Sequence, residues 1–254
     1  MTNLFRIPSI AVLLLFMIFF SGYNLKAQTK LMQQPALSDT HVSFIYAEDL
    51  WIANKDGSNP IRLTIDEGIE SNPIFSPDGS MIAFNAQYDG NSDVFIVPVN
   101  GGIPKRLTWH PYNDLVRDFS ADGKTILFAS QRNSFTNRYM QLFTISIHGG
   151  TTTQLDIPNA FWASYSDDNS HIAYTPIADR FNQWKHYRGG TATRIWLYNT
   201  KSHKVEEIQK PAGGSNDSQP KWMGDDVYFK SDRDGEFNLY SYNTSTKAID
   251  KLTD

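Results

Sequence analysis

The chain has 254 residues, of which 13% are aromatic and none is cysteine, so disulfide bonds and a lipid-anchored cysteine are excluded. Its formal net charge is −4, and the sequence contains no basic stripe of the kind that nucleic-acid binding requires. This composition favours a globular domain with a packed aromatic core and no nucleic-acid partner.

The N-terminus predicts a secretory signal peptide covering residues 1–27. Arg6 supplies a positive charge, residues 10–20 form an uninterrupted apolar run, and a more polar segment ends at Ala27. An apolar run of about eleven residues is short for a bilayer span and typical of a signal peptide. We expect cleavage after Ala27 and a periplasmic or secreted protein without membrane contact; an uncleaved anchor is the alternative.

The remainder of the chain is a repeat of short strand units. In the second unit, Ser76-Pro77-Asp78-Gly79 joins two apolar runs. Proline presets φ, aspartate can bond its own backbone and glycine accommodates a positive φ, so this stretch predicts a tight β-hairpin. Similar turns recur at 120–123 and 166–169.

Each unit also closes with a similar short segment, which we call the blade tag. The tags are Arg62-Leu63-Thr64, Arg106-Leu107-Thr108, Gln154-Leu155, Glu207-Ile208 and Lys251-Leu252-Thr253. Their apolar residues lie 44, 48, 53 and 44 positions apart. A four-stranded unit of this length is typical of one propeller blade.

The predicted fold class is therefore all-β, a β-propeller of four-stranded antiparallel blades. The nearly continuous apolar runs at 94–97 and 126–129 indicate strands that are buried on both faces, as in stacked blades. The predicted blades cover about 37–64, 71–108, 113–156, 159–209 and 216–254.

Several polar groups resemble sites but lack a complete pattern. Asp89, Asn91 and Asp93 imitate the start of a calcium loop, without its glycine at the sixth position and its glutamate at the twelfth. The six histidines show no pairing at metal spacing, and no Gly-x-Ser-x-Gly elbow occurs. We predict no cofactor, no metal site and no catalytic residue in this chain.

One stretch departs from the repeat, at 177–193 in the fourth unit. Its centre supplies the candidate contact residues Trp184, Lys185, His186, Tyr187, Arg188, Gly189 and Gly190. Two interpretations stay open. The loop contacts a ligand, peptide or neighbouring domain through stacking and carboxylate pairing by Lys185 and Arg188, or it folds back and packs Trp184 and Tyr187 on its own blade.

The blade tags, the turns and above all Trp184-Lys185-His186-Tyr187-Arg188-Gly189-Gly190 resemble the N-terminal propeller of tricorn proteases and their bacterial homologues. The resemblance covers about 37–254. It implies a six-bladed propeller followed by a seven-bladed propeller, a PDZ domain and a serine-peptidase core. The catalytic residues of that core match no position here, so the implied role is to guide or filter oligopeptides for proteolysis elsewhere.

From the resemblance we expect a truncated or split member with five of six blades. Its expected partners are oligopeptides and the missing propeller, PDZ and peptidase-core domains, and a homo-oligomer is also implied. A stand-alone periplasmic binding module similar to TolB, or the propeller cap of a prolyl-oligopeptidase-type enzyme, is the alternative. We further expect uncovered blade faces with side chains drawn from Phe44, Tyr46, Trp51, Trp222, Tyr228, Phe229 and Tyr240.

Overall fold

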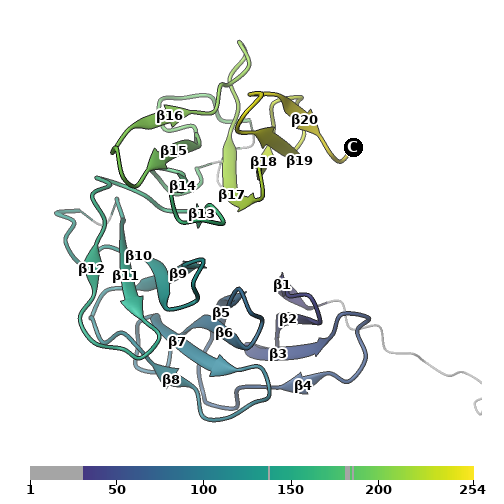
Figure 1. Cartoon of the computed structure of the whole chain (residues 1–254), viewed down its shortest axis with the longest axis vertical. Coiled ribbons are helices and arrows are strands. Elements are labelled where there is room, and N and C mark those ends of the chain that lie inside the picture. The colour runs from purple at the N-terminus through teal and green to yellow at the C-terminus, as the bar shows by residue number, and fades with distance from the viewer. Residues whose placement is uncertain (1–30, 137, 181–183, 185) are drawn as a thin grey trace, which may run out of the picture. The chain divides into compact units, whose positions relative to one another are not determined.

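Five four-stranded antiparallel sheets make up the chain between residues 32 and 254, and each sheet is one blade (Figure 1). This computed structural model describes residues 31–254 except 137, 181–183 and 185. The predicted signal peptide and Lys185 lie outside the described residues. Within them no helix is assigned, and hence none with the length and apolarity that crossing a membrane requires.

The strands of each blade follow one another in space in the order of the sequence. The first two blades contain β1 (Gln33–Leu37), β2 (His41–Tyr46), β3 (Asp49–Asn54) and β4 (Ile61–Arg62), then β5 (Glu70–Phe75), β6 (Met81–Ala86), β7 (Asp93–Pro98) and β8 (Lys105–Arg106). The third contains β9 (Asp114–Phe119), β10 (Thr125–Ser130), β11 (Gln141–Ser146) and β12 (Thr153–Gln154). The last two contain β13 (Ala163–Tyr165), β14 (His171–Tyr174), β15 (Trp196–Asn199) and β16 (Val205–Glu207), then β17 (Asp217–Met223), β18 (Asp226–Ser231), β19 (Asn238–Asn243) and β20 (Ile249–Lys251).

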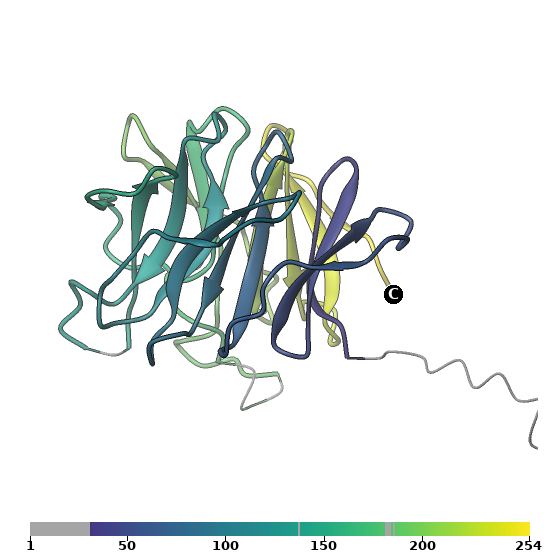
Figure 2. The same ribbon diagram turned by 90° about the horizontal axis from the view of Figure 1, so that it is seen from below.

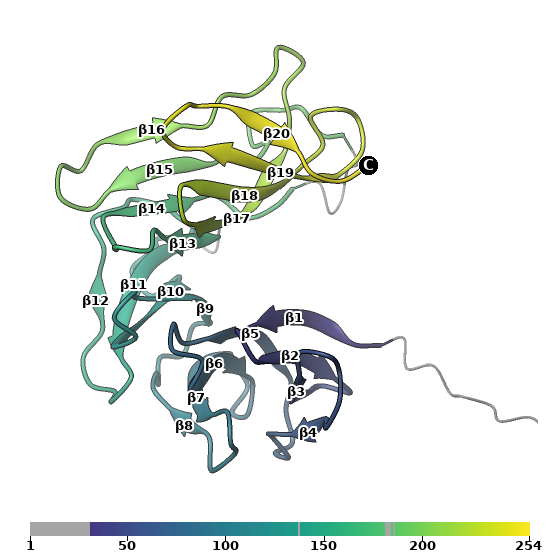
Figure 3. The ribbon, with the colours of Figure 1, turned by 45° about the vertical axis from the view of Figure 1, so that its right-hand side comes forward.

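The first strands of neighbouring blades contact one another in the order β1, β5, β9, β13 and β17, so they lie innermost. Figure 2 shows the sheets from the side, and Figures 1 and 3 show that the arc is open between the first and fifth blades. The all-β propeller prediction is confirmed. The expected first blade began at residue 37, whereas its sheet includes β1, whose five residues are mostly exposed and carry little apolar signal.

The predicted hairpin turns owe their shape to a serine and an aspartate. Ser76 Oγ donates a hydrogen bond of 2.6 Å to Asp78, and the same oxygen accepts the Met81 N–H at 3.0 Å. The bond from Ser76, together with those from the N–H and hydroxyl of Ser80, lowers the pKa of Asp78 to about 2. Gly79 has a φ of +68°, as the turn predicts. Matching serine–aspartate bonds of 2.7 Å occur in the third and fourth blades.

Four hydrophobic clusters supply the core, one between each pair of consecutive blades. Phe84, for example, packs against the first blade, and the neighbouring Ala83 packs towards the third. Because successive side chains of a strand point to opposite faces, a central blade is buried on both sides. The predicted two-sided burial of 94–97 and 126–129 is confirmed.

The uncovered faces of the first and fifth blades differ from the expectation. Trp222, Phe229 and Tyr240 are buried, because they point towards the fourth blade. On the first blade Phe44 and Trp51 lie opposite each other in the register and are only half-buried. Tyr46 of the first blade and Tyr228 of the fifth are half-buried as well, so the uncovered aromatic surface belongs mainly to the first blade.

Candidate functional site

The inserted connection joins β14 to β15 and spans residues 175–195. Its counterparts in the second, third and fifth blades span only 87–92, 131–140 and 232–237. All of these lie at the edge where the first strand of each blade begins, because the strands are antiparallel. We call this edge the entry edge.

The first anchor of the insertion is Asp179. Trp162 Nε1 donates to its Oδ2 at 3.2 Å, and Ser218 Oγ donates to its Oδ1 at 2.5 Å. Trp162 precedes the innermost strand of the fourth blade and Ser218 lies in that of the fifth. Burial raises the pKa of Asp179 against these hydrogen bonds. One carboxyl group thus ties the insertion to two blades.

The second anchor joins Arg188 to Asp232 of the fifth blade. Arg188 Nη1 lies 2.7 Å from Asp232 Oδ2, and its Nη2 donates to the Asp232 carbonyl at 3.3 Å. The backbone and side-chain amides of Asn216 donate to the same carboxylate at 2.7 and 3.0 Å. Burial alone raises the pKa of Asp232, but the bonds from Asn216 and Arg188 outweigh it and hold this pKa below its usual range.

Around the second anchor, described residues of the insertion pack on one another. The rings of Trp184 and Tyr187 stack with centroids 6.1 Å apart, and Thr191 Oγ1 donates to Tyr187 Oη at 3.0 Å. A Cβ at Gly189 would lie 2.2 Å from Tyr187 Oη, whereas one at Gly190 would meet nothing within 4 Å. Gly189 is thus the glycine that leaves room for the hydroxyl end of the Tyr187 ring.

The structure brings only part of the predicted residue set together. Tyr187, Arg188 and Gly189 share the anchored end, His186 Nδ1 lies 4.0 Å from Asp232 Oδ2, and Trp184 is 61% exposed. Arg188 pairs with Asp232 of the next blade of the same propeller, and the Trp184–Tyr187 stack lies within the loop and not on its own blade. Neither contact involves a ligand or a separate domain, so both interpretations of the loop stay open.

Sequence reasoning missed Asp179, Asp232 and Asn216. Asp232 is the first residue of the segment 232–236, which matches an ordinary hairpin turn. Its sequence context therefore does not indicate a buried carboxylate. The available signal was the charge of Arg188, which needs an acidic partner when it is half-buried.

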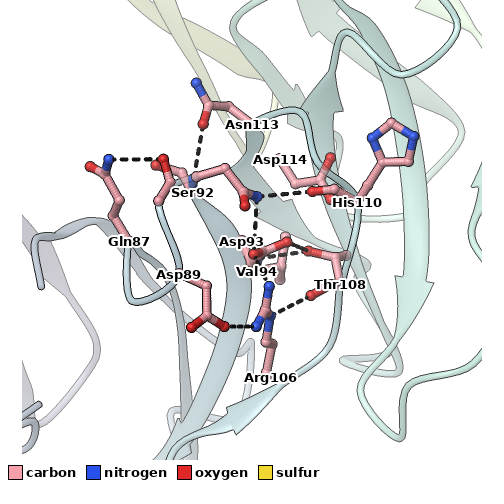
Figure 4. Close-up of polar contacts among 12 residues, drawn as sticks. Gln87, Asp89, Ser92, Asp93, Val94, Arg106, Thr108, His110, Asn113 and Asp114 are labelled. Atoms are coloured by element: carbon pink, nitrogen blue, oxygen red, sulfur yellow. Dashed lines mark hydrogen bonds and ion pairs between the residues drawn. The ribbon is translucent and has the colours of Figure 1, made fainter.

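The blade tags hold the entry edge together, as the second blade shows (Figure 4). Arg106 Nη2 lies 2.6 Å from Asp93, and its Nε donates to the Thr108 carbonyl at 2.9 Å. Thr108 Oγ1 accepts the Val94 N–H at 2.9 Å. Arg106 also pairs with Asp89, so both carboxylates of the calcium-like segment have an arginine partner.

The first blade repeats this arrangement residue for residue. Arg62 pairs with Asp49 at 2.8 Å, and Thr64 Oγ1 accepts the Leu50 N–H at 2.9 Å. In the fifth blade Thr253 Oγ1 accepts the Leu239 N–H at 3.0 Å. In these three blades the tag therefore fastens the end of the fourth strand to the start of the third, and so supports the loops of the entry edge.

Stacked four-stranded blades with an anchored aromatic loop at one edge define a β-propeller domain that presents loops from a rigid scaffold. The tricorn protease N-terminal beta propeller domain model matches residues 29–254. The chain belongs to this family and corresponds to the propeller portion of a tricorn-like protease.

Individual relatives agree with this assignment. Tricorn protease homolog 1 of Streptomyces coelicolor is 30% identical over 79% of this chain and 19% of its own length. The tricorn protease homolog of Saccharolobus solfataricus is 25% identical over 91% of this chain and 21% of its own length. The crystal structure of the tricorn protease superposes with a TM-score of 0.76 at 22% identity, over 88% of this chain and 22% of that one. The chain thus spans about a fifth of the length of each of these three proteins.

Proposed function

We propose that this chain guides oligopeptides towards a peptidase core of the tricorn type and carries no catalytic group of its own. The insertion at the entry edge is the contact element. Its partners in this role are extended peptides and the further propeller, PDZ and peptidase domains that the family resemblance implies.

One observation carries the proposal, namely the exposure of Trp184 on an anchored loop. Asp179 and Arg188 fasten the insertion on either side of Trp184, and the indole stacks on Tyr187. An indole held in place loses little conformational entropy on binding, which favours its use as a contact residue. Its exposed face suits the side chains and peptide groups of an extended ligand.

A binding comparison of two exposed tryptophans tests this role. We expect Trp184→Ala to weaken the binding of fluorescently labelled peptides at least tenfold, measured by anisotropy. Trp109→Ala is the matched control, because Trp109 is 73% exposed on the connection that follows the second blade and stacks on Arg106 instead. Equal effects of the two substitutions would overturn the proposed role of the insertion.

The absence of catalysis is tested separately. Serine and cysteine nucleophiles need a base within hydrogen-bond reach, and the sequence offers no motif that supplies such a pair. We expect no turnover of fluorogenic peptides by the purified chain. Turnover that is abolished by a point substitution within the chain would contradict the proposal.

The stand-alone binding module remains the competing function, because one fold supports both roles. The reading frame beyond residue 254 separates them: a PDZ domain and a peptidase core favour the guiding role, and a stop after one further blade favours the binding module. We also propose export, with a mature N-terminus after Ala27. Mass spectrometry of the exported protein tests that position.

A further inference from the structure

A hollow of about 670 Å³ opens between the third and fourth blades. Thr136, Arg138 and Tyr139 line it from the β10–β11 connection, and Ala178 and Arg180 line it from the insertion. Both connections belong to the entry edge, so the hollow borders the loop that carries Trp184.

The charge of this hollow is unbalanced. Its described lining residues supply two guanidinium groups and no carboxylate, since the intervening Asp179 is bonded to Trp162 and Ser218 instead. Among the described residues, neither the Arg138 nor the Arg180 side chain forms a hydrogen bond or ion pair. The other described arginines all bond to a carboxylate or a carbonyl: Arg62, Arg106, Arg117, Arg132, Arg188, Arg194 and Arg233.

This contrast points to an external anion. Two like charges that face one hollow repel each other, and an anion between them removes that repulsion. Guanidinium groups bind carboxylates through paired hydrogen bonds, and the hydroxyls of Thr136 and Tyr139 add further donors. Guanidinium groups bind phosphates in the same way, but the ligand of the proposed function is a peptide, so the group that fits is a carboxylate.

Exposed aromatic side chains on the same two connections further restrict the class of peptide that would fit. Phe135 is fully exposed next to Thr136, and Trp184 follows Arg180 by four residues. Guanidinium and aromatic groups together match a peptide that carries an acidic side chain close to a bulky apolar one.

We propose that this hollow binds the carboxylate side chain of a glutamate or aspartate within an extended peptide. The propeller would then select acidic oligopeptides rather than all oligopeptides. This inference rests on the proposed peptide-guiding function and names its substrate class.

The test compares two labelled peptides that differ only in Glu against Gln, each acetylated at the N-terminus and amidated at the C-terminus, with a phenylalanine next to the variable position. We expect the purified chain to bind the Glu peptide about tenfold more tightly at low salt. In Arg138→Gln/Arg180→Gln this preference should vanish. Lys124→Gln/Lys201→Gln is the control, because it removes the same charge at the opposite edge of the blades.

Each outcome bears on the inference. Equal binding of both peptides, lost in Trp184→Ala, overturns the carboxylate site and leaves the guiding function standing. No binding of either peptide overturns both. A Gln peptide with a free C-terminus that binds as tightly as the Glu peptide, and loses this gain in the arginine variant, assigns the hollow to chain termini and overturns the side-chain assignment. Unchanged melting temperatures confirm that the variants are folded.

Discussion

At the scale of single residues, the two anchors of the insertion titrate in opposite directions. Asp179 receives hydrogen bonds from the neutral donors Trp162 and Ser218, so burial prevails and its pKa is raised. Asp232 receives the guanidinium of Arg188 as well as the amides of Asn216, so its pKa is lowered. The Asp232 anchor therefore needs an ionised carboxylate, whereas at Asp179 burial favours the protonated form and outweighs the two hydrogen bonds that favour the ionised form.

This difference gives a pH-dependent prediction for Arg188. Arg188→Ala should lower the free energy of unfolding at pH 7 by about 1.5–3 kcal/mol, because it removes a charge-assisted hydrogen bond to a buried acid. An acid whose pKa is lowered by folding stabilises above its ordinary pKa of about 3.9 and loses that contribution as the pH falls through the folded value. The penalty should therefore shrink towards pH 3, as urea unfolding at the two pH values would reveal.

The control for this measurement is Arg194→Ala. Arg194 and Glu207 form an exposed pair at 3.5 Å, for which we expect a cost below about 1 kcal/mol. A penalty for Arg188→Ala that is the same at pH 7 and pH 3 would show that the Asp232 pair does not supply the stability.

The two neighbouring glycines allow a second test at this scale. Gly189→Ala places a methyl group where Tyr187 Oη lies, so the ring must move and the stack with Trp184 must open. We expect an altered Trp184 emission spectrum and weaker peptide binding. The loss of global stability should be small, because the Tyr187 side chain moves to make room and the backbone does not. Gly190→Ala should leave both measurements unchanged; an equal response would refute the role of Gly189.

At the scale of structural elements, three of the five blade tags end on a threonine, and two of these three also begin with an arginine. The threonine caps a backbone N–H of the third strand, and the arginine pairs with the aspartate that begins it. The fourth strands are only two or three residues long and form few backbone hydrogen bonds with the third strands. The side-chain bonds of the tag add hydrogen bonds that a longer strand would form through its backbone.

Thr108→Val isolates this contribution, because valine matches threonine in shape but lacks the hydroxyl. The Val94 N–H is buried and would lose its acceptor, which should cost about 1–3 kcal/mol in urea unfolding. Thr153→Val, at an exposed position of β12, should change stability by less than about 0.5 kcal/mol. Similar values for the two variants would argue against the capping role.

At the scale of the whole molecule, stability comes from the faces between blades. Each of the four clusters joins two consecutive blades, so a blade on its own buries little apolar surface. The first blade has one face without a described neighbour, and the half-buried pair Phe44 and Trp51 lies on it.

We therefore expect the purified chain to self-associate or to bind a hydrophobic dye such as ANS, since contiguous exposed apolar surface marks an interface. Trp51→Gln should reduce both effects, as sedimentation velocity and dye fluorescence would measure. A wild-type chain that sediments as a monomer, binds no dye and unfolds cooperatively would show that this face needs no partner.

The sequence by itself determined the architecture. Turn residues such as Pro77-Asp78-Gly79 determine the backbone conformation of four consecutive residues, and the tags recur at the length of one blade. Both patterns can therefore be recognised in the sequence without knowledge of any tertiary contact. The family resemblance rested on the same local patterns and on the inserted segment, and the family model confirmed it.

Only the tertiary structure decided which side chains meet across blades. Arg188 and Asp232 are 44 residues apart, and no periodicity links them. It also placed Gln34, Asn72 and Gln219, each before a proline, at positive φ in bulges of the innermost strands, where sequence patterns favour plain extended chain. Pairings between blades depend on how neighbouring sheets stack, and that geometry arises only when the repeats assemble.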